Sequence, residues 1–195
     1  DMISPTRFEK EVAILNSHPD IDLVTTGLCS VAANKHPIGI RCAQPGYSPS
    51  GRELLLLQHS ICHAAILGRK SWFLRNPYDE GQDIVSEDFE LWLRAFSKGD
   101  LNIHVISEPL YFYLEGTSLS AEKILRSYRH QRRCYKEYGS LWLDPWEIPL
   151  LTLKSYSKSF IVMILSALDR MDILLGKRNK SIAEMSLLGH LNQEI

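Results

Sequence analysis

The run IDLVTTGLCSVA at residues 21–32 narrows the choice of folds more than any other segment of the chain. It is rich in apolar and β-branched side chains, which is typical of a buried strand. A helical pattern precedes it, because Phe8, Val12 and Leu15 recur at helical spacing. We therefore expect a helix followed by a buried strand, which is the opening of an α/β fold.

Both ends of this first helix carry recognisable signals. Ser4 suits a helix cap and Pro5 suits the first helical position, so the helix is predicted to begin there. Pro19 disfavours helical geometry at His18, so the segment NSHPD at 16–20 is predicted to end it.

The rest of the chain changes character near residue 118. Mixed α/β patterns come before this point and helical patterns after it, which predicts one part at 1–118 and a helical extension at 119–195. The pattern predicts a short strand at 38–42 within a loop, a short helix at about 51–58, a strand at about 61–67, a helix at 87–98, one or two strands within 101–115, and helices at 120–139 and about 150–176.

Composition excludes several classes of protein. Hydrophobic residues make up 45% of the 195 residues, enough for a sizeable core. The net charge of −1 argues against a dedicated nucleic-acid binder, which usually has a marked basic excess. The four cysteines are scattered and form no CxxC pair, which favours reduced thiols in a cytosolic protein over a disulfide framework or a zinc site.

The segment SEDFELWLRAF at 86–96 has two interpretations, of which the first is structural. Ser86 is a suitable helix cap, and the carboxylates of Glu87 and Asp88 would be stabilised in the first turn by the helix dipole. Glu90 and Arg94 are spaced for an ion pair along the helix. The predicted buried stripe consists of Phe89, Trp92, Leu93 and Phe96.

The second interpretation is catalytic. A carboxylate at a helix N-terminus that follows a loop can point into a cleft and act as general base toward an alcohol. The like charge of Glu87 would raise the pKa of Asp88, whereas the helix dipole would lower it. Local physics alone leaves both interpretations open.

Four segments resemble family 2 glycosyltransferases. SEDFELWLRAFSKGD is similar to the acidic-pair segment of these enzymes, and DMISPTRFEKEVAILNSHPDIDLVTT is similar to the segment that begins at the last Asp of their D-x-D-D metal motif. ILGRKSWF and ISEPLYFYLEGTSLS also resemble family segments, and the order and spacing of all four agree. The resemblance covers roughly residues 1–120.

The resemblance implies a fold and an activity. It implies the C-terminal half of a GT-A domain, with a Rossmann-like sheet, followed by a helical region. It also implies an inverting transfer of sugar from a nucleotide-sugar donor to a glycan or lipid-linked acceptor. Such a protein would build a bacterial surface polysaccharide in the cytoplasm, at the inner face of the cell membrane. The nucleotide-binding half of the family would precede Asp1, so we expect the chain to be a piece of a longer enzyme.

The resemblance also implies the roles of individual residues. Asp88 would be the catalytic base and Glu87 its neighbour. Asp1 would belong to the metal site, which in the intact enzyme would hold Mg²⁺ or Mn²⁺ on the donor diphosphate. His59, His63 and Arg69 would contact the acceptor.

The residues themselves also allow other roles for this last group. His59, Cys62 and His63 invite a metal site, but no fourth ligand is evident, so packing or lining of a cleft is favoured. Arg69, like the adjacent Lys70, could meet a phosphate, but an exposed, solvated charge is favoured.

The C-terminal region raises the question of membrane contact. The uncharged segment SFIVMILSAL at 159–168 is too short to span a bilayer. Lys154 and Lys158 precede it, and Lys177, Arg178 and Lys180 follow it. This pattern suits an interfacial helix, and it also suits a helix packed on the catalytic part. The basic segment at 126–139 could be a solvated face or a contact for anionic head groups.

A rival to the enzyme is therefore a non-catalytic module. Its helical, basic C-terminal region would dock on membranes or partners, beside a degenerate glycosyltransferase half.

Overall fold

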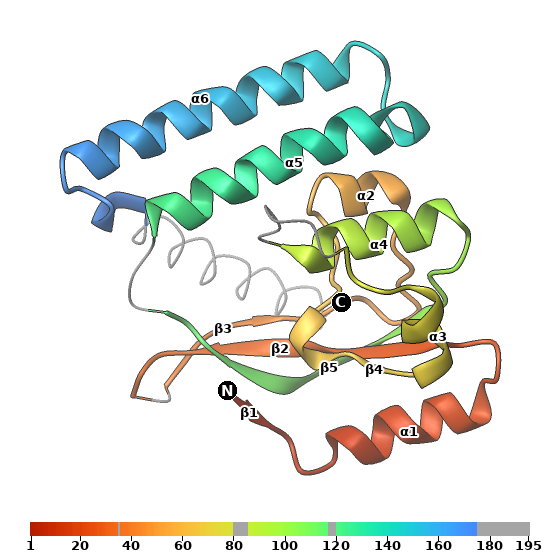
Figure 1. Ribbon diagram of the computed structural model, residues 1–195. Coiled ribbons are helices and arrows are strands. Elements are labelled where there is room, and N and C mark those ends of the chain that lie inside the picture. The colour runs from red at the N-terminus through yellow and green to blue at the C-terminus, as the bar shows by residue number, and fades with distance from the viewer. Residues whose placement is uncertain (35, 80–85, 117–119, 175–195) are drawn as a thin grey trace.

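The computed structural model describes residues 1–34, 36–79, 86–116 and 120–174, and it shows a mixed α/β fold (Figure 1). Five strands form one mixed sheet in the order β1-β5-β2-β3, and β4 pairs with β2 beside this path. The strands are β1 (Met2–Ile3), β2 (Leu23–Val31), β3 (Pro37–Arg41), β4 (Leu67–Gly68) and β5 (Ile103–Leu114). The helices are α1 (Arg7–Ser17), α2 (Gly51–Leu55), α3 (Lys70–Arg75), α4 (Glu87–Ser97), α5 (Ala121–Trp142) and α6 (Glu147–Ala167).

The sheet lies between two helical layers (Figure 1). Helix α1 covers one face through a small core of Leu15, Val24, Ile106 and Leu110. Helices α2 to α5 cover the other face, and α6 lies outermost, against α5. Any site between the sheet and helices α2 to α5 therefore lies on the opposite face of the sheet from α1.

Strands β2 and β5 form the centre of this sheet. They run parallel, with Leu23 opposite Ile103 at one end and Val31 opposite Leu114 at the other. Eight of the nine positions of β2 are buried, as expected for an apolar run with neighbours on both edges and both faces. The predicted strands within 21–32 and 101–115 are therefore confirmed, the second as a single strand.

The main core joins both predicted parts of the chain. Cys134, Tyr135 and Tyr138 of α5 pack in the same cluster as Leu54 of α2 and Phe89 of α4. The change of sequence character near residue 118 therefore does not divide the hydrophobic core.

The segment 61–67 does not form the predicted strand. The chain makes a 3-10 helix at His63–Ala65, and only Leu67–Gly68 pairs with β2. Helix α3 follows at once and was not predicted. Apolar character within 61–67 reflects core packing of Ile61 and Ala65, not strand pairing.

Helix α1 begins at Arg7, three residues after Ser4, and its buried face includes the expected Leu15 but is rotated away from the other two expected residues. Phe8 and Val12 are 50% and 45% exposed, whereas Arg7 and Glu11 are buried. Arg7 donates a hydrogen bond to Glu11 at 3.1 Å, and this pairing is what makes the burial of two charged residues tolerable.

Helix α6 begins earlier and ends earlier than the predicted range of about 150–176. Pro149 lies in its first turn, where no backbone N–H is needed. Glu147–Ala167 is long and apolar enough to cross a membrane by length and composition, although core helices of soluble proteins also meet that criterion. The basic residues Lys177, Arg178 and Lys180, which follow the predicted apolar segment, lie outside the described residues.

An ion pair between Arg52 and Glu147 ties α2 to α6 and makes stability depend on pH. Arg52 donates two hydrogen bonds to the Glu147 carboxylate, at 2.8 and 2.6 Å. This pairing lowers the pKa of Glu147 from 4.5 to about 2. A lowered folded-state pKa means that the pair stabilises the fold above about 4.5 and that this stabilisation is lost as the pH falls toward 2.

We expect Arg52→Gln to lower the free energy of unfolding at neutral pH, with a difference from wild type that shrinks as the pH falls toward about 2. Urea unfolding at a series of pH values measures this difference. Arg170→Gln is the control, because both members of its pair with Asp172 are more than half exposed. A difference that stays constant with pH would show that the loss comes from packing of the arginine stem.

Candidate active site

Asp88 lies at the start of α4, in the second position of the helix. Its Oδ1 accepts a hydrogen bond from the backbone N–H of Phe89 at 2.9 Å, and Oδ2 has no hydrogen-bond partner among the described residues. The side chain is half-buried, whereas the adjacent Glu87 is exposed. The two carboxylates therefore do not share one environment, and Asp88 is the one that meets a cavity.

That cavity is small, with a volume of about 140 Å³. Asp88 shares it with Leu57 and His59 from the loop after α2, and with Ser127 and Gln131 from α5. Neither α5 residue belonged to the predicted site, because residues forty positions apart in sequence give no local signal of their proximity.

The backbone around this cavity is strained. Ser86 and Leu57 both have positive φ, at 99° and 57°, which costs non-glycine residues of order 1–3 kcal/mol each. They are two of the three such residues in the described chain, and both line the cavity. Backbone strain of this kind concentrates at functional sites.

The predicted cap at Ser86 is wrong in its detail. Ser86 occupies the N-cap position, but its hydroxyl makes no capping hydrogen bond and lies 3.4 Å from the Ser127 hydroxyl. The predicted Glu90–Arg94 pair is confirmed, with a distance of 2.8 Å. Three of the four residues of the predicted stripe are buried, namely Phe89, Trp92 and Leu93, whereas Phe96 is only partly buried. Glu90, Leu91 and Ala95 are buried as well. The helix is thus firmly packed, and Asp88, Phe89 and Trp92 of its first two turns line the cavity.

His59 is the nearest titratable neighbour of Asp88 in this cavity. Burial lowers the pKa of His59, which outweighs the opposing effects of the Asp88 and Glu53 charges. Its Nδ1 accepts a hydrogen bond from the Ile61 N–H at 3.2 Å. A neutral imidazole that accepts at Nδ1 carries its proton on Nε2, so His59 is a donor on its other side.

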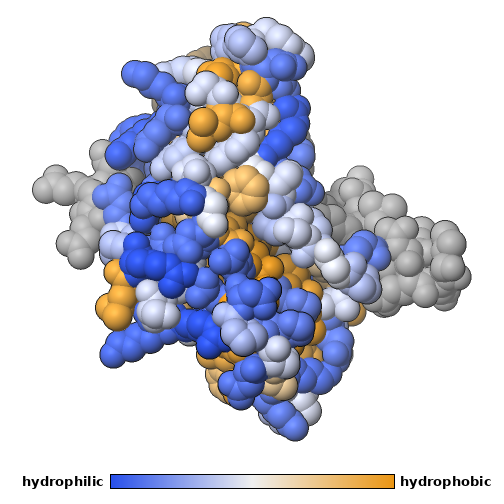
Figure 2. Space-filling model, turned by 90° about the vertical axis from the view of Figure 1, so that its right-hand side faces the viewer, coloured by the Kyte–Doolittle hydropathy of each residue, from blue (hydrophilic) through white to orange (hydrophobic). Residues whose placement is uncertain are grey.

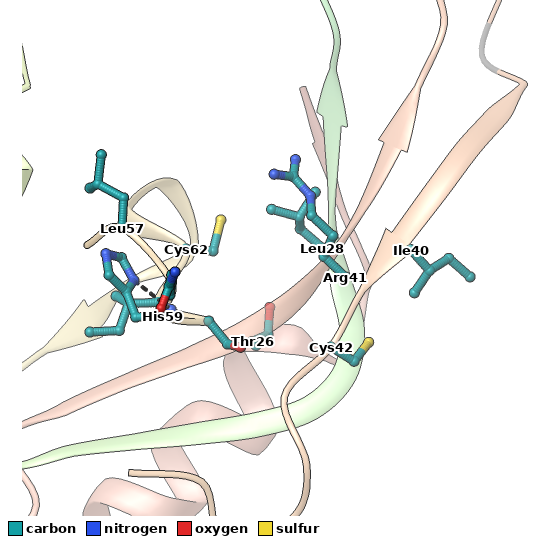
Figure 3. Close-up of a pocket in the computed structure, with 11 residues that line it drawn as sticks. Thr26, Leu28, Ile40, Arg41, Cys42, Leu57, His59 and Cys62 are labelled. Carbon is teal, nitrogen blue, oxygen red and sulfur yellow. Dashed lines mark hydrogen bonds between the residues drawn. The ribbon is translucent and has the colours of Figure 1, made fainter. Parts of the chain in front are cut away.

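A larger cavity of about 390 Å³ continues from the same loop (Figure 3). Leu57 and His59 line both cavities. In Figure 3 the side chains of Arg41 and Cys62 point into the space between the sheet and the loop, while Ile40 and Cys42 point away from it. Thr25 of β2 donates a hydrogen bond to the Cys62 carbonyl at 2.9 Å and fixes the loop on the sheet.

The charged group of this larger cavity is Arg41. It contacts Ser30 at 3.2 Å and Glu115 at 3.5 Å. Burial raises the pKa of the Cys62 thiol, although Arg41 partly opposes the rise. Cys62 is therefore a protonated thiol, which is a poor nucleophile. The cavity thus offers the Arg41 cation, the hydroxyls of Thr26 and Ser60 and the imidazole of His59.

His63 lies on the same side of the sheet but in an aromatic cluster. Its ring centroid is 5.5 Å from that of Trp92, and its Nε2 is 3.4 Å from the Tyr78 hydroxyl. Burial, followed by the charges of Glu87 and Asp88, raises the pKa of Tyr78. Tyr78 is thus close to the acidic pair, a proximity that sequence analysis missed.

Arg69 has a structural role at the end of α1. Its guanidinium donates hydrogen bonds to the carbonyls of Ile21 at 2.9 Å, of Leu15, and of His18 at 3.4 Å. Arg69 lines neither of the two cavities. We therefore leave it out of the site.

Asp1 directly precedes the edge strand β1, and both of its carboxylate oxygens already accept hydrogen bonds. It accepts hydrogen bonds from the Tyr111 hydroxyl at 2.9 Å and the Leu114 N–H at 2.8 Å. Within residues 1–34, 36–79, 86–116 and 120–174, no group of three or more His, Cys, Asp or Glu side chains is placed to hold a metal ion. The described residues do not fit a metal site by themselves.

The structure therefore brings Asp88 and His59 to one cavity, with Glu87 and His63 nearby, and leaves Arg69 and Asp1 elsewhere. All four cysteines are free thiols. The sequence of this chain matches no protein-family model and no curated protein.

Proposed function

We propose that the chain is the acceptor-binding, catalytic part of an inverting glycosyltransferase with a GT-A fold. The single observation that supports this most is the Asp88 carboxylate, half-buried at a helix N-terminus and open to a cavity. The resemblance of SEDFELWLRAFSKGD to the acidic-pair segment of family 2 enzymes points to the same residue. The mixed α/β sheet is compatible with the proposal.

In the proposed reaction, Asp88 accepts the proton of an acceptor hydroxyl. The hydroxyl oxygen forms a bond to the anomeric carbon of the donor sugar, on the face opposite the nucleotide. The bond from that carbon to the diphosphate oxygen breaks, and the nucleotide diphosphate leaves with the electron pair. One displacement inverts the configuration of the sugar.

Asp88 suits the role of base better than its neighbours do. Its Oδ2 has no hydrogen-bond partner among the described residues, and the side chain lines the cavity. Cys62 and Tyr78 have raised pKa values and keep their protons. The Nδ1 lone pair of neutral His59 is already used by the Ile61 N–H, so its Nε2–H can donate but has no lone pair to accept a proton. Asp88 is left as the acceptor of a proton.

The other elements of the proposal follow from the resemblance alone. They are a nucleotide-sugar donor, a glycan or lipid-linked acceptor, Mg²⁺ or Mn²⁺ in the intact enzyme, a role in bacterial surface polysaccharide synthesis, and a place at the cytoplasmic face of the membrane. Because the described residues do not fit a metal site, no step above is routed through a metal.

The test is a transfer assay on the gene product that contains these residues together with a nucleotide-binding half. Nucleotide sugars are supplied singly, and release of nucleotide diphosphate is measured with and without a glycan acceptor. Acceptor-dependent release supports the proposal. The absence of any upstream nucleotide-binding sequence would favour the non-catalytic module.

His59 is expected to assist sugar transfer by donating one hydrogen bond from its Nε2–H. His59→Leu, which has no donor, should lower the transfer rate by roughly two- to thirteenfold, the effect of losing one neutral hydrogen bond of about 0.5–1.5 kcal/mol. His18→Leu, at the exposed end of α1, is the matched control and should retain the wild-type rate. A loss as large as that of an Asp88 variant would make His59 the base instead.

A further inference from the structure

Helix α6 is packed on α5 by one narrow, partly polar face. Ser155, Ser159 and Val162 are the buried residues of the helix. Arg132 of α5 donates hydrogen bonds to the hydroxyls of Ser155 and Ser159, both at 3.1 Å. These hydrogen bonds fix which side of α6 faces the protein.

The opposite side of α6 carries an apolar stripe that nothing in the described chain covers. At 3.6 residues per turn, five large side chains lie on the side away from Ser155 and Ser159. Leu153 and Phe160 are 64% and 61% exposed, and each of the five exceeds 40%. The apolar stripe consists of Leu150, Leu153, Phe160, Ile161 and Ile164. Figure 2 shows hydrophobic side chains exposed beside hydrophilic ones in this upper layer of the molecule.

Cationic side chains border the apolar stripe on both sides. Lys154 and Lys158 lie one turn apart along one border, and both are exposed. Along the other border, a groove of about 650 Å³ runs between α5 and α6. Its cationic residues are Arg129, Arg132, Arg133 and Lys136 of α5. Arg132 lies over the Tyr156 ring at 4.2 Å, which places a cation next to an exposed aromatic edge of α6.

The arrangement of these charges distinguishes among three possible environments of the apolar stripe, which are a second copy of the chain, the interior of a bilayer and the surface of a membrane. In a two-fold contact between copies of this chain through the apolar stripe, the same cations would face each other, and like-charge juxtaposition is costly. A helix that spans a bilayer would carry Lys154 and Lys158 into the hydrocarbon, which is also costly. An apolar stripe between two rows of cations is complementary to an anionic lipid surface.

We propose that α6 lies in the plane of an anionic membrane surface, with the apolar stripe in the acyl boundary and the exposed flanking lysines Lys136, Lys154 and Lys158 on lipid phosphates. The proposal does not rest on the glycosyltransferase activity, and its test uses no turnover. It explains why an exposed helix combines large apolar residues with an orientation fixed by Arg132.

The experiment is co-sedimentation of the full 195-residue chain with vesicles of phosphatidylcholine alone and of phosphatidylcholine mixed with phosphatidylglycerol. We expect strong binding to the mixed vesicles only, weakened by added salt because salt screens the cations. Lys154→Gln with Lys158→Gln should lower the partition coefficient about fivefold per charge removed. Leu153→Ser should lower it about tenfold through lost apolar burial.

Matched controls separate these effects from general changes in charge or hydrophobicity. Lys70→Gln with Lys98→Gln removes the same charge from the sheet-covering layer, and Leu74→Ser changes a leucine that is 73% exposed on α3. Both controls should bind mixed vesicles as wild type does. Equal binding to both kinds of vesicle, or unchanged binding by Leu153→Ser, would overturn the proposal. A dimer in sedimentation equilibrium that Leu153→Ser dissociates, without a change in vesicle binding, would assign the apolar stripe to a second copy instead.

Discussion

Replacement of Asp88 by Asn is expected to lower the rate of sugar transfer by about 10²–10⁴-fold, or about 3–5 kcal/mol of activation free energy. Asn has nearly the same size, and its side-chain oxygen can still accept the Phe89 N–H hydrogen bond that now measures 2.9 Å. The substitution therefore removes basicity and little else. The melting temperature and the donor affinity should stay close to those of the wild type.

Glu87→Gln is the matched control for this substitution. Glu87 is adjacent and carries the same charge, but it is exposed, so its amide should cost much less in rate. Rate, donor affinity and melting temperature are measured for both variants. Near-normal turnover of Asp88→Asn would mean that the acidic pair only stabilises the start of α4.

Phe89→Ala is expected to produce the largest loss of stability, about 3–5 kcal/mol in the free energy of unfolding. Phe89 is 5% exposed in the main core, and its ring meets His130 of α5 edge-on at 6.2 Å between centroids. Removing the ring leaves a cavity between α4 and α5. Phe89→Ala should therefore lower stability, whereas Asp88→Asn at the adjacent residue should lower turnover.

Urea unfolding measures this loss, with Phe8→Ala as the control. Phe8 is 50% exposed on α1, so the same truncation should cost only about 0.5–1 kcal/mol, including its contact with the Arg7 guanidinium. Equal losses in the two variants would show that Phe89 does not contribute to the core as described.

The segments with long, uniform patterns were predictable from the sequence. The run at 21–32 became β2, and the amphipathic segment at 87–98 became α4, because each pattern matches the environment that the element occupies. The Glu90–Arg94 pair was predictable for the same reason, since it depends only on helical spacing.

Short segments and long-range contacts were not predictable in this way. The apolar residues of 61–67 fill a core without pairing as a strand, and periodicity does not distinguish these two outcomes in so short a run. On α1, Leu15 is buried as expected, but Arg7 and Glu11, which pair with each other, are buried in place of Phe8 and Val12. Arg41 and Tyr78 lie near the site although they come from segments distant in the sequence. Arg69 donates hydrogen bonds to backbone carbonyls that only the folded chain brings close to it.

The stereochemistry of the transferred sugar tests the central claim most directly. Proton NMR of the product, taken early in the reaction, reports the anomeric configuration relative to the donor. We predict an inverted product from the wild-type enzyme and none at a comparable rate from Asp88→Asn. A product with retained configuration, or an inverted product formed at the wild-type rate by Asp88→Asn, would contradict the assignment of Asp88 as the base of a single displacement.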